Sequence, residues 1–333
     1  MDEFLDDMDD EQVDDLLMPE EDETSSSQMY EHFRFVADKG QSLLRVDKFL
    51  VDRMMGATRN RIQLAAEAGC ILVNDKPVKS NYRVKPLDVV SIVMDRPRRE
   101  LEIIPEDIPL NIVYEDDDLL VVNKPAGLVV HPGHGNYTGT LVNALAYYLK
   151  DDPYYDPSDP RLGLVHRIDK DTTGSLIICK NDEAHRNIAE QIKEHSVTRR
   201  YVGVVAGTFS EESGTVEGAI GRHPNDRKRM TINEKNGKPA VTHYRVLQTL
   251  KGASFMEFEL ETGRTHQIRV HMASISHPLL GDTVYGNSKN PYKLQGQALH
   301  ARTIGFIHPT TGEYIEVSAP IPEYMTELVR KLS

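Results

Sequence analysis

The hydrophobic pattern along the chain predicts two stretches of regular secondary structure, separated by a polar segment near residue 100. In the first stretch, apolar residues recur every three or four positions, as they do on the buried face of a helix. Two short apolar runs bounded by turn residues follow, which is typical of strands. We expect a compact unit over residues 42–94, with helices over 43–54 and from the cap residue Thr58 to Gly69, and strands over 71–73 and 89–93.

In the second stretch, apolar runs of strand length outnumber helical patterns and mostly follow one another. This order favours a mixed, largely antiparallel sheet over a regular alternation of strands and helices. We therefore predict an α+β fold, in which residues 107–333 form the larger domain. Strands are expected at 112–114, 119–122, 175–179, 201–205, 241–250 and 255–260, and helices after the cap residue Thr138 and over 184–192.

Charge is distributed unevenly along the chain. The net charge is −13, but residues 1–24 alone contain 13 acidic residues and no Lys or Arg, so residues 1–28 are expected to form a disordered acidic tail. Residues 42–99 contain 12 basic and 6 acidic residues, a net charge of +6. Such an excess is typical of a nucleic-acid binder, although an ordinary solvated surface can have the same composition. Residues 95–106, which are rich in Arg and Pro, are expected to form a linker.

The sequence lacks the features of a membrane, secreted or cofactor-dependent protein. No apolar run approaches the roughly 20 residues of a membrane helix, and the N-terminus is no secretory signal. Cys70 and Cys179 lie in apolar surroundings and are expected to pack as small hydrophobes in a reducing cytoplasm. His131 and His134 have no third ligand nearby, so we expect no metal. No phosphate-loop or dinucleotide-binding pattern is present.

The segment Leu164–Gly174 is a candidate for chemistry, because it places Arg167 and Asp169 two residues apart at a loop edge between apolar runs. An adjacent guanidinium keeps a carboxylate ionised at neutral pH, and functional residues often lie on loops held by a rigid scaffold. Asp169 is therefore a candidate nucleophile or base. A purely structural ion pair is an equally open alternative.

Three further segments carry residues that suit RNA or an active site. Tyr201 opens an apolar strand, where it would either pack in the core or stack on a base. Arg264 and Arg269 flank an expected loop-to-helix junction, and their planar donors suit a carboxylate or a phosphate. Residues 222–229 form a basic hairpin tip that is either a solvated turn or a phosphate contact.

The order of elements over residues 42–94 resembles the S4 domain, a small RNA-binding module. The matching segments are Arg45–Leu50, Thr58–Arg61, Gly69–Asn74 and Leu87–Asp88. The resemblance implies an S4-like α/β domain whose basic helical face binds the phosphates of structured RNA. The basic residues concerned are Arg45, Lys48, Arg59 and Arg61.

The later segments together resemble the RluA/RluD-type pseudouridine synthases, which isomerise uridines in large-subunit ribosomal RNA. The preceding S4-like module points to the RluD-like branch of that family. One departure is Ile168, where the family often has leucine. The matching segments are Asn123–Pro132, His166–Asp169, Thr172–Gly174, Arg200–Tyr201, Gly263–His271, His277–Asp282, Leu299–Ala301 and Phe306–Pro309.

The resemblance also implies roles for individual residues. Asp169 would be the catalytic carboxylate, and Arg269 would pair with it and keep it ionised. Tyr201 would stack on the target base and assist proton transfer at C5, while Arg167 would fill the gap left by the displaced uridine. Whether Asp169 attacks the sugar, attacks the base or removes a ribose proton stays open. Further RNA contacts are expected from Arg264, His266, Arg227, Lys228 and Arg229.

The implied reaction moves ribose C1′ from N1 to C5 of uracil, and it needs no cofactor or metal. The expected partner is large-subunit ribosomal RNA within the assembling subunit, and free RNA stays open as the alternative substrate. By analogy the protein is expected to be a monomer. A catalytically inactive assembly factor on the same fold is the main alternative, but the joint presence of Asp169, Tyr201 and Arg269 favours an enzyme. A glycosidase would normally need a second catalytic carboxylate, and Asp171 does not make such a pair.

Overall fold

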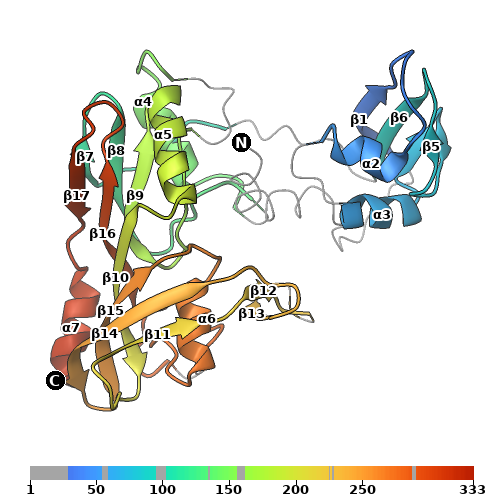
Figure 1. The fold of residues 1–333 in the computed structure, drawn as a ribbon. Coiled ribbons are helices and arrows are strands. Elements are labelled where there is room, and N and C mark those ends of the chain that lie inside the picture. Colours follow the sequence, from blue (N-terminus) through green and yellow to red (C-terminus); the bar gives the residue numbers. More distant parts are fainter. Residues whose placement is uncertain are drawn as a thin grey trace. The chain divides into compact units, whose positions relative to one another are not determined.

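The chain divides into two compact units, Met1–Glu102 and Ile103–Ser333 (Figure 1). The expected acidic tail and residues 95–102 of the expected linker lie outside the described residues. The computed structural model describes residues 29–333 except 55–58, 95–102, 134–135, 156–161, 225, 227–228 and 287–289, and it does not describe the side chains of Asn60 and Arg61.

The first unit packs two helices against a four-stranded antiparallel sheet with the strand order β1-β6-β3-β4. Its first strand pairs along its length with β6 and precedes the region that the sequence predicted as a domain. The elements are β1 (Tyr30–Val36), β2 (Leu44–Arg45), α2 (Val46–Val51), α3 (Arg59–Glu67), β3 (Ile71–Val73), β4 (Lys76–Pro77), β5 (Arg83–Val84) and β6 (Val89–Met94).

The helix expected over residues 43–54 is wrong at its start. Leu44 and Arg45 pair with β5 as a short strand, and the helix begins only at Val46. The N–H of Val46 donates to the carbonyl of Tyr82 at 2.7 Å, so a tertiary contact overrides the local helical spacing. Thr58, the expected cap of the next helix, lies outside the described residues.

The second unit is built on a nine-stranded sheet with the strand order β11-β14-β15-β10-β16-β9-β8-β7, and β17 also pairs with β16. Within this sheet β9 and β16 run parallel, whereas the other pairs are antiparallel. The predicted α+β fold with a mixed, largely antiparallel sheet is confirmed. The strands are β7 (Ile112–Glu115), β8 (Leu119–Lys124), β9 (Thr173–Cys179), β10 (Thr198–Ala206), β11 (Ser213–Glu217), β14 (Val241–Leu250), β15 (Ala253–Leu260), β16 (Leu299–Ile307) and β17 (Tyr314–Ser318).

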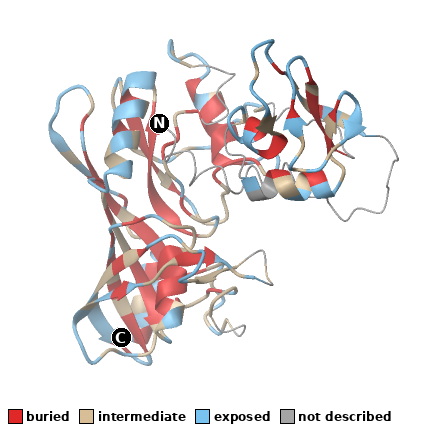
Figure 2. Cartoon of the chain, turned by 45° about the vertical axis from the view of Figure 1, so that its right-hand side comes forward, coloured by how far each residue is buried: buried red, intermediate tan, exposed pale blue. Residues whose placement is uncertain are grey.

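The helices cover both faces of this sheet, and a small hairpin adjoins it. Buried residues are concentrated on the central strands of the sheet (Figure 2). One face packs against α4 and α6, and the opposite face against α5 and α7. The elements are α4 (Leu141–Leu149), α5 (Asp182–Lys193), α6 (Gln267–Ser274), α7 (Glu323–Leu332) and the hairpin strands β12 (Ile220–Arg222) and β13 (Met230–Ile232).

Successive residues of a strand point to opposite faces of the sheet, so they contact different helices. Along β8, Leu120 and Val122 pack with α4, whereas Leu119 and Val121 pack with α5. Tyr201 of β10 contacts both the α4 cluster and the α6 cluster. Tyr201 therefore lies between the parts of that face that α4 and α6 cover. The candidate site residues lie near the same place.

The helix expected to follow Thr138 is capped by Thr140, so that cap prediction is wrong. The Thr140 hydroxyl accepts the N–H of Asn143, and the Asn143 side chain accepts the N–H of Thr140 at 3.0 Å, which is a reciprocal capping box. Gly139 has φ +68° and makes the turn into this cap. Asn143 Nδ2 also donates to the carbonyl of Ile104 at 2.9 Å. Part of the expected linker therefore packs on α4.

Candidate active site

Asp169 opens the short turn that leads into β9. The side chain of Ile168 is buried in the α4 cluster, and the N–H of Thr172 donates to the Asp169 carbonyl at 3.1 Å. Gly174 has φ +114°, and a Cβ there would overlap the carbonyl oxygen of Ala301. Only glycine allows β9 to approach β16 so closely, and this approach fixes the base of the Asp169 loop.

Arg269 holds the carboxylate of Asp169. Its Nη1 donates to Asp169 Oδ2 at 2.9 Å, while Nε and Nη2 donate to the two oxygens of Asp282 at 2.7 and 3.1 Å. Asp282 is fully buried and also accepts the N–H of Val284 and of Tyr285. One planar guanidinium thus bridges two carboxylates, of which the buried one fixes its orientation.

The Asp169 carboxylate is ionised and reachable. Burial opposes its charge, but the charges of His266 and Arg269 outweigh burial and lower the pKa of Asp169 below its usual value, with a further contribution from Arg167. The side chain of Asp169 is 21% exposed, and Arg167 is exposed beside it. A held, ionised and partly exposed carboxylate can attack a carbon or accept a proton.

Tyr201 lies on β10, near the carboxylate of Asp169. Burial raises the pKa of Tyr201 to about 12, the charge of Arg199 opposes this, and the nearby carboxylate of Asp169 adds to it. The register of β10 against β16 shifts between Arg200 and Tyr201, and such bulges redirect side chains next to active sites. Tyr201 is therefore a protonated phenol whose ring is only partly covered.

The loop before α6 carries Arg264 and His266. Gln267 fixes this loop, because its side chain accepts from Arg264 N–H at 3.0 Å and donates to the Val241 carbonyl at 2.9 Å. Arg264 Nε donates to the carbonyl of Pro239 at 3.2 Å. His266 Nε2 lies 3.8 Å from Asp169 Oδ1. The loop therefore brings the imidazole of His266 to the side of Asp169 that Arg269 does not occupy.

Two further residues of the site were missed in the sequence. Tyr285 lies beyond the last residue of its matching segment, yet its ring is 5.0 Å from the Arg269 guanidinium carbon. Lys124 is fully buried, and its Nζ donates to the carbonyls of Pro125, Leu128 and Lys170 at 2.7 to 2.9 Å. A lysine that ends an apolar strand and precedes proline was a signal that could have been followed.

Replacing Lys124 with methionine is expected to destabilise the fold by about 3 kcal/mol or more, because three carbonyls would lose the buried ammonium group that donates to them. Burial lowers the pKa of Lys124 to about 7, and the carboxylates of Asp169 and Asp171 oppose that shift. Urea unfolding of the full chain measures the change, with the exposed Lys331→Met as control. An unchanged free energy of unfolding would mean that these three bonds do not hold the Asp169 loop.

The structure describes part of the basic hairpin. Arg227 and Lys228, two of its expected RNA contacts, lie outside the described residues. Arg229 lies with its guanidinium carbon 5.5 Å from the centre of the Tyr285 ring. The hairpin therefore approaches the Asp169 site through Tyr285.

In the first unit, the expected basic face is organised around a buried carboxylate. Asp47 is fully buried, and Arg45 and Arg59 contact it at 2.8 and 3.1 Å. Burial opposes the charge of Asp47, but hydrogen bonds led by the one from Arg45 lower its pKa. Lys48 is exposed, and the side chain of Arg61 lies outside the described residues. Asp47 thus fixes two of the four predicted cations in place.

Among the described residues, one group has the donor atoms for a metal ion, namely Asp116, Asp118 and His308. Hydrogen bonds account for its geometry. His308 Nδ1 accepts the N–H of Thr310 at 3.2 Å, so Nε2 donates to Asp116 at 2.9 Å. The group joins the β7–β8 turn to the β16–β17 turn, at the opposite end of β8 from Lys124. We assign it a structural role.

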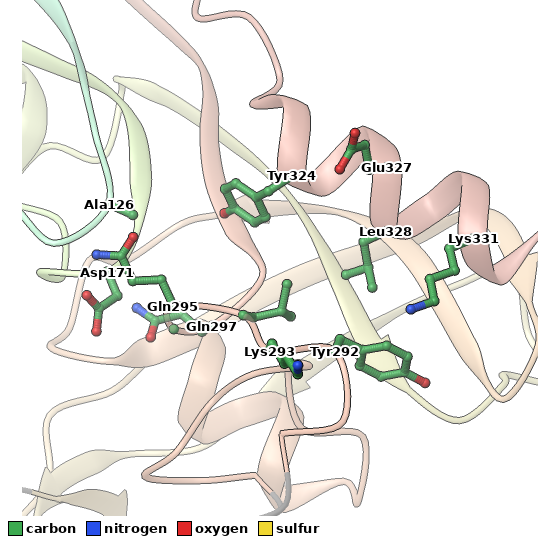
Figure 3. Close-up of a pocket in the computed structure, with 12 residues that line it drawn as sticks. Ala126, Asp171, Tyr292, Lys293, Gln295, Gln297, Tyr324, Glu327, Leu328 and Lys331 are labelled. Atoms are coloured by element: carbon green, nitrogen blue, oxygen red, sulfur yellow. The ribbon is translucent and has the colours of Figure 1, made fainter.

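A groove of about 390 Å³ lies between α7 and the segment 292–297 (Figure 3). Asp171 and Gln297 lie at one end of it, and Asp169 does not line it. A Cβ at Gly296 would overlap the Asp171 side chain. Asp169 and Asp171 therefore lie in different surroundings, which argues against their acting as a glycosidase pair.

No helix in the described parts of the chain is long and apolar enough to cross a membrane.

Known proteins match both units of the chain. A family model described as RNA pseudouridylate synthase matches residues 118–274, and an S4 domain model matches residues 44–90. The chain is 46% identical over 296 residues to the RNA pseudouridine synthase YlyB of Bacillus subtilis, a match that covers 89% of this chain and 96% of that protein. The chain belongs to the RNA pseudouridine synthase family.

Other relatives agree with this assignment. This chain is 44% identical to the ribosomal large subunit pseudouridine synthase D of Zymomonas mobilis. The match covers 86% of this chain and 93% of that protein. The structure of human RNA pseudouridylate synthase domain containing 1 matches with a TM-score of 0.52 at 30% identity, over 67% of this chain and 85% of that one. The expected S4 domain and isomerase family are confirmed, so the substrate is RNA.

Proposed function

We propose that this pseudouridine synthase isomerises uridines in large-subunit ribosomal RNA within the assembling subunit, with Asp169 as the reacting carboxylate. Relatives such as the Zymomonas mobilis protein carry the large ribosomal subunit in their names and match most of the chain. The S4 domain adds a module suited to structured RNA. Both observations support a folded ribosomal RNA as the substrate.

One observation carries the proposed role of Asp169. Its carboxylate is ionised, partly exposed and held by Arg269, which in turn is fixed by the fully buried Asp282. Pseudouridine formation breaks the N1–C1′ bond, forms a C5–C1′ bond, removes a proton from C5 and adds one at N1. A positioned carboxylate supplies the nucleophile or base for that exchange.

The neighbours of Asp169 complete the proposed mechanism. Tyr201 presents a protonated phenol beside Asp169 and would stack on the extruded uracil and relay the proton from C5. Arg167, exposed on the same loop, would enter the space left by the flipped nucleotide. Extrusion costs about a few kcal/mol, and unpaired loops reduce that cost. A single-stranded loop of the ribosomal RNA is therefore the expected target.

Positive charge outside the site would hold the RNA. Lys48 is exposed on α2 of the S4 domain, and Arg45 and Arg59 are held beside it by Asp47. In the second unit, Arg264 and Arg229 lie on the two segments that flank the Asp169 site. Contacts of this kind bind phosphates without reading the sequence, and they weaken as salt rises.

Tritium release tests the proposed function. Ribosomal RNA transcripts labelled with tritium at C5 of uridine would be incubated with the purified full-length protein, because isomerisation replaces the C5–H bond. We expect release from large-subunit RNA and far less from small-subunit RNA, with no free uracil. Equal release from both RNAs would contradict the substrate assignment, and free uracil would contradict isomerisation.

A further inference from the structure

We propose that His266 is a positioning residue for Asp169, and that Tyr285 holds its ring so that a proton on Nε2 always faces the carboxylate. The inference rests on the proposed role of Asp169 and assigns His266 a function other than the RNA contact expected from the sequence. Four observations carry it: the two sides of the Asp169 carboxylate, the backbone of His266, the hydroxyl of Tyr285 and the turn that connects them.

The two oxygens of Asp169 face different groups. Oδ2 accepts a hydrogen bond from Arg269 at 2.9 Å, whereas Oδ1 faces Nε2 of His266 at 3.8 Å. The longer contact exceeds a hydrogen bond but lies within ion-pair distance. Contacts of catalytic groups are often long before the substrate binds and shorten in the complex. Arg269 and His266 together fix the plane of the carboxylate.

The backbone of His266 is unusual for this role. His266 caps α6 with φ 57° and ψ 20°, in the left-handed region that glycine and asparagine adopt more readily. A residue other than glycine held in a sparsely populated region costs about 1 kcal/mol or more. The side chain makes no capping bond to the helix. The imidazole instead makes contacts away from the cap, and these include Asp169 and Tyr285.

The Tyr285 hydroxyl determines which ring nitrogen of His266 carries the proton. Its oxygen accepts the N–H of Met230 at 2.7 Å and lies 2.8 Å from His266 Nδ1. Burial raises the pKa of Tyr285, so the hydroxyl stays protonated. Because its oxygen already accepts from Met230, the hydroxyl would donate to Nδ1 of the neutral ring. In the neutral ring the proton of His266 then resides on Nε2. The imidazolium also carries a proton there, so both forms present N–H to Asp169.

A single short turn supports both groups that face Asp169. Asp282 fixes Arg269 through two hydrogen bonds, and the N–H of Tyr285 donates to Asp282 Oδ1 at 3.0 Å. The ring of Tyr285 packs edge-on against His266, with ring centres 5.6 Å apart. Through Met230, the same hydroxyl is bonded to the β12–β13 hairpin. Residues 282–285 therefore set the geometry of the carboxylate from two directions.

Variants of His266 test the positioning role. Glycine and asparagine both suit the left-handed backbone, so His266→Gly and His266→Asn remove the imidazole without adding strain. We expect each to lower kcat about 10- to 100-fold, since a displacement of about 1 Å can cost that much, while Kd for RNA changes by less than about threefold. Added imidazole should restore part of the turnover of His266→Gly and none of Asp169→Asn.

Three results would overturn the positioning role of His266. Full turnover of His266→Asn would show that the ring is not needed. Weaker RNA binding at unchanged kcat would make His266 an RNA contact. Lost turnover that imidazole does not restore would assign the effect to the loop backbone. A dead Asp169→Asn beside a fully active His266→Asn would leave the proposed function standing and reject this inference alone.

Tyr285→Phe tests the hydroxyl separately. Among the contacts that the structure describes, the charged and titratable groups near His266 are Asp169, Tyr285 and, on either side of the Tyr285 ring, Arg269 and Arg229. Without the hydroxyl, the neutral ring is free to place its proton on Nδ1, whereas the imidazolium keeps one on Nε2. We therefore expect kcat of Tyr285→Phe to match the wild type at low pH, where the imidazolium is present, and to fall below it as pH rises and the neutral ring replaces the imidazolium.

Tyr314→Phe is the matched control for the hydroxyl variant. Tyr314 is exposed on β17, and its hydroxyl bonds Thr198 and Glu316 rather than any residue of the site. This variant should follow the wild-type pH profile of kcat throughout. A Tyr285→Phe profile identical to the wild type, or lowered equally at every pH, would overturn the role of the hydroxyl.

Discussion

Asp169→Asn is expected to lower isomerisation by about 10⁴-fold or more, the scale of losing a nucleophile or base in other enzymes. Asparagine has the shape of aspartate but neither its charge nor its basicity. Arg269 and Asp282 remain to hold the loop, so Kd for RNA should stay within a few fold. Tritium release from C5-labelled RNA measures turnover, and filter binding measures affinity.

Asp171→Asn is the matched control, because it removes a carboxylate from the same turn. Asp171 lines the groove beside α7 and packs against Gly296, away from the Arg269 contact. Its turnover should remain within a few fold of the wild type. Retained isomerisation by Asp169→Asn would remove Asp169 from the mechanism, and an equal loss in both variants would point to damage of the turn.

Arg269→Ala is expected to have the second largest effect, on both stability and turnover. Asp282 is fully buried and bonded by two nitrogens of Arg269, and removing one partner of such a pair costs about 3–5 kcal/mol. The Asp169 carboxylate would also lose its hydrogen bond. We expect urea unfolding at lower concentration and turnover at neutral pH reduced by about 100-fold, as for a misplaced catalytic group.

Arg269→Ala is also expected to change how kcat depends on pH in the acid range. Asp169 has a lowered pKa, so the wild type keeps its carboxylate charged until pH falls through that low value. The stability from this charge is present above the unfolded value of about 3.9 and is lost as pH falls through the folded one. Arg269→Ala removes one of the charges that lower the pKa of Asp169. The acid limb of kcat should therefore move to higher pH.

A double variant separates the two effects of Arg269. Arg269→Ala with Asp282→Ala removes the buried carboxylate together with its partner, so part of the lost stability should return. Turnover should stay low, because Asp169 still lacks its hydrogen bond. If Arg269→Ala alone unfolds at the wild-type urea concentration and keeps the wild-type acid limb, then Arg269 neither supports Asp282 nor keeps Asp169 ionised.

The sequence predicted those parts of the fold that local pattern determines. Strands β8 and β9 contain the unbroken apolar runs Leu119–Val122 and Leu176–Cys179, because both faces of the sheet are covered there. β1 was left unassigned, since its alternating polar residues fit a strand only once β6 lies beside it. The start of α2 was wrong for a similar reason, because pairing with β5 is not visible in helical spacing.

The candidate site was predictable as a set of segments, but its geometry was not. Spacing alone suggested Arg167 as the partner of Asp169, and only the family resemblance pointed to Arg269, which is 100 residues away. Tyr285 and Lys124 were missed because their importance depends on carbonyls, rings and N–H groups from distant segments. Such contacts leave no periodic pattern in the sequence, because they form only when the chain has folded.

A map of pseudouridine in ribosomal RNA tests the central claim most directly. Cells lacking this gene would be complemented either with the wild-type gene or with Asp169→Asn, and both maps would be compared with that of the deletion. We expect particular large-subunit uridines to lose the modification in the deletion, to regain it with the wild type and to stay unmodified with Asp169→Asn. Large-subunit maps that are identical in all three strains would contradict the account.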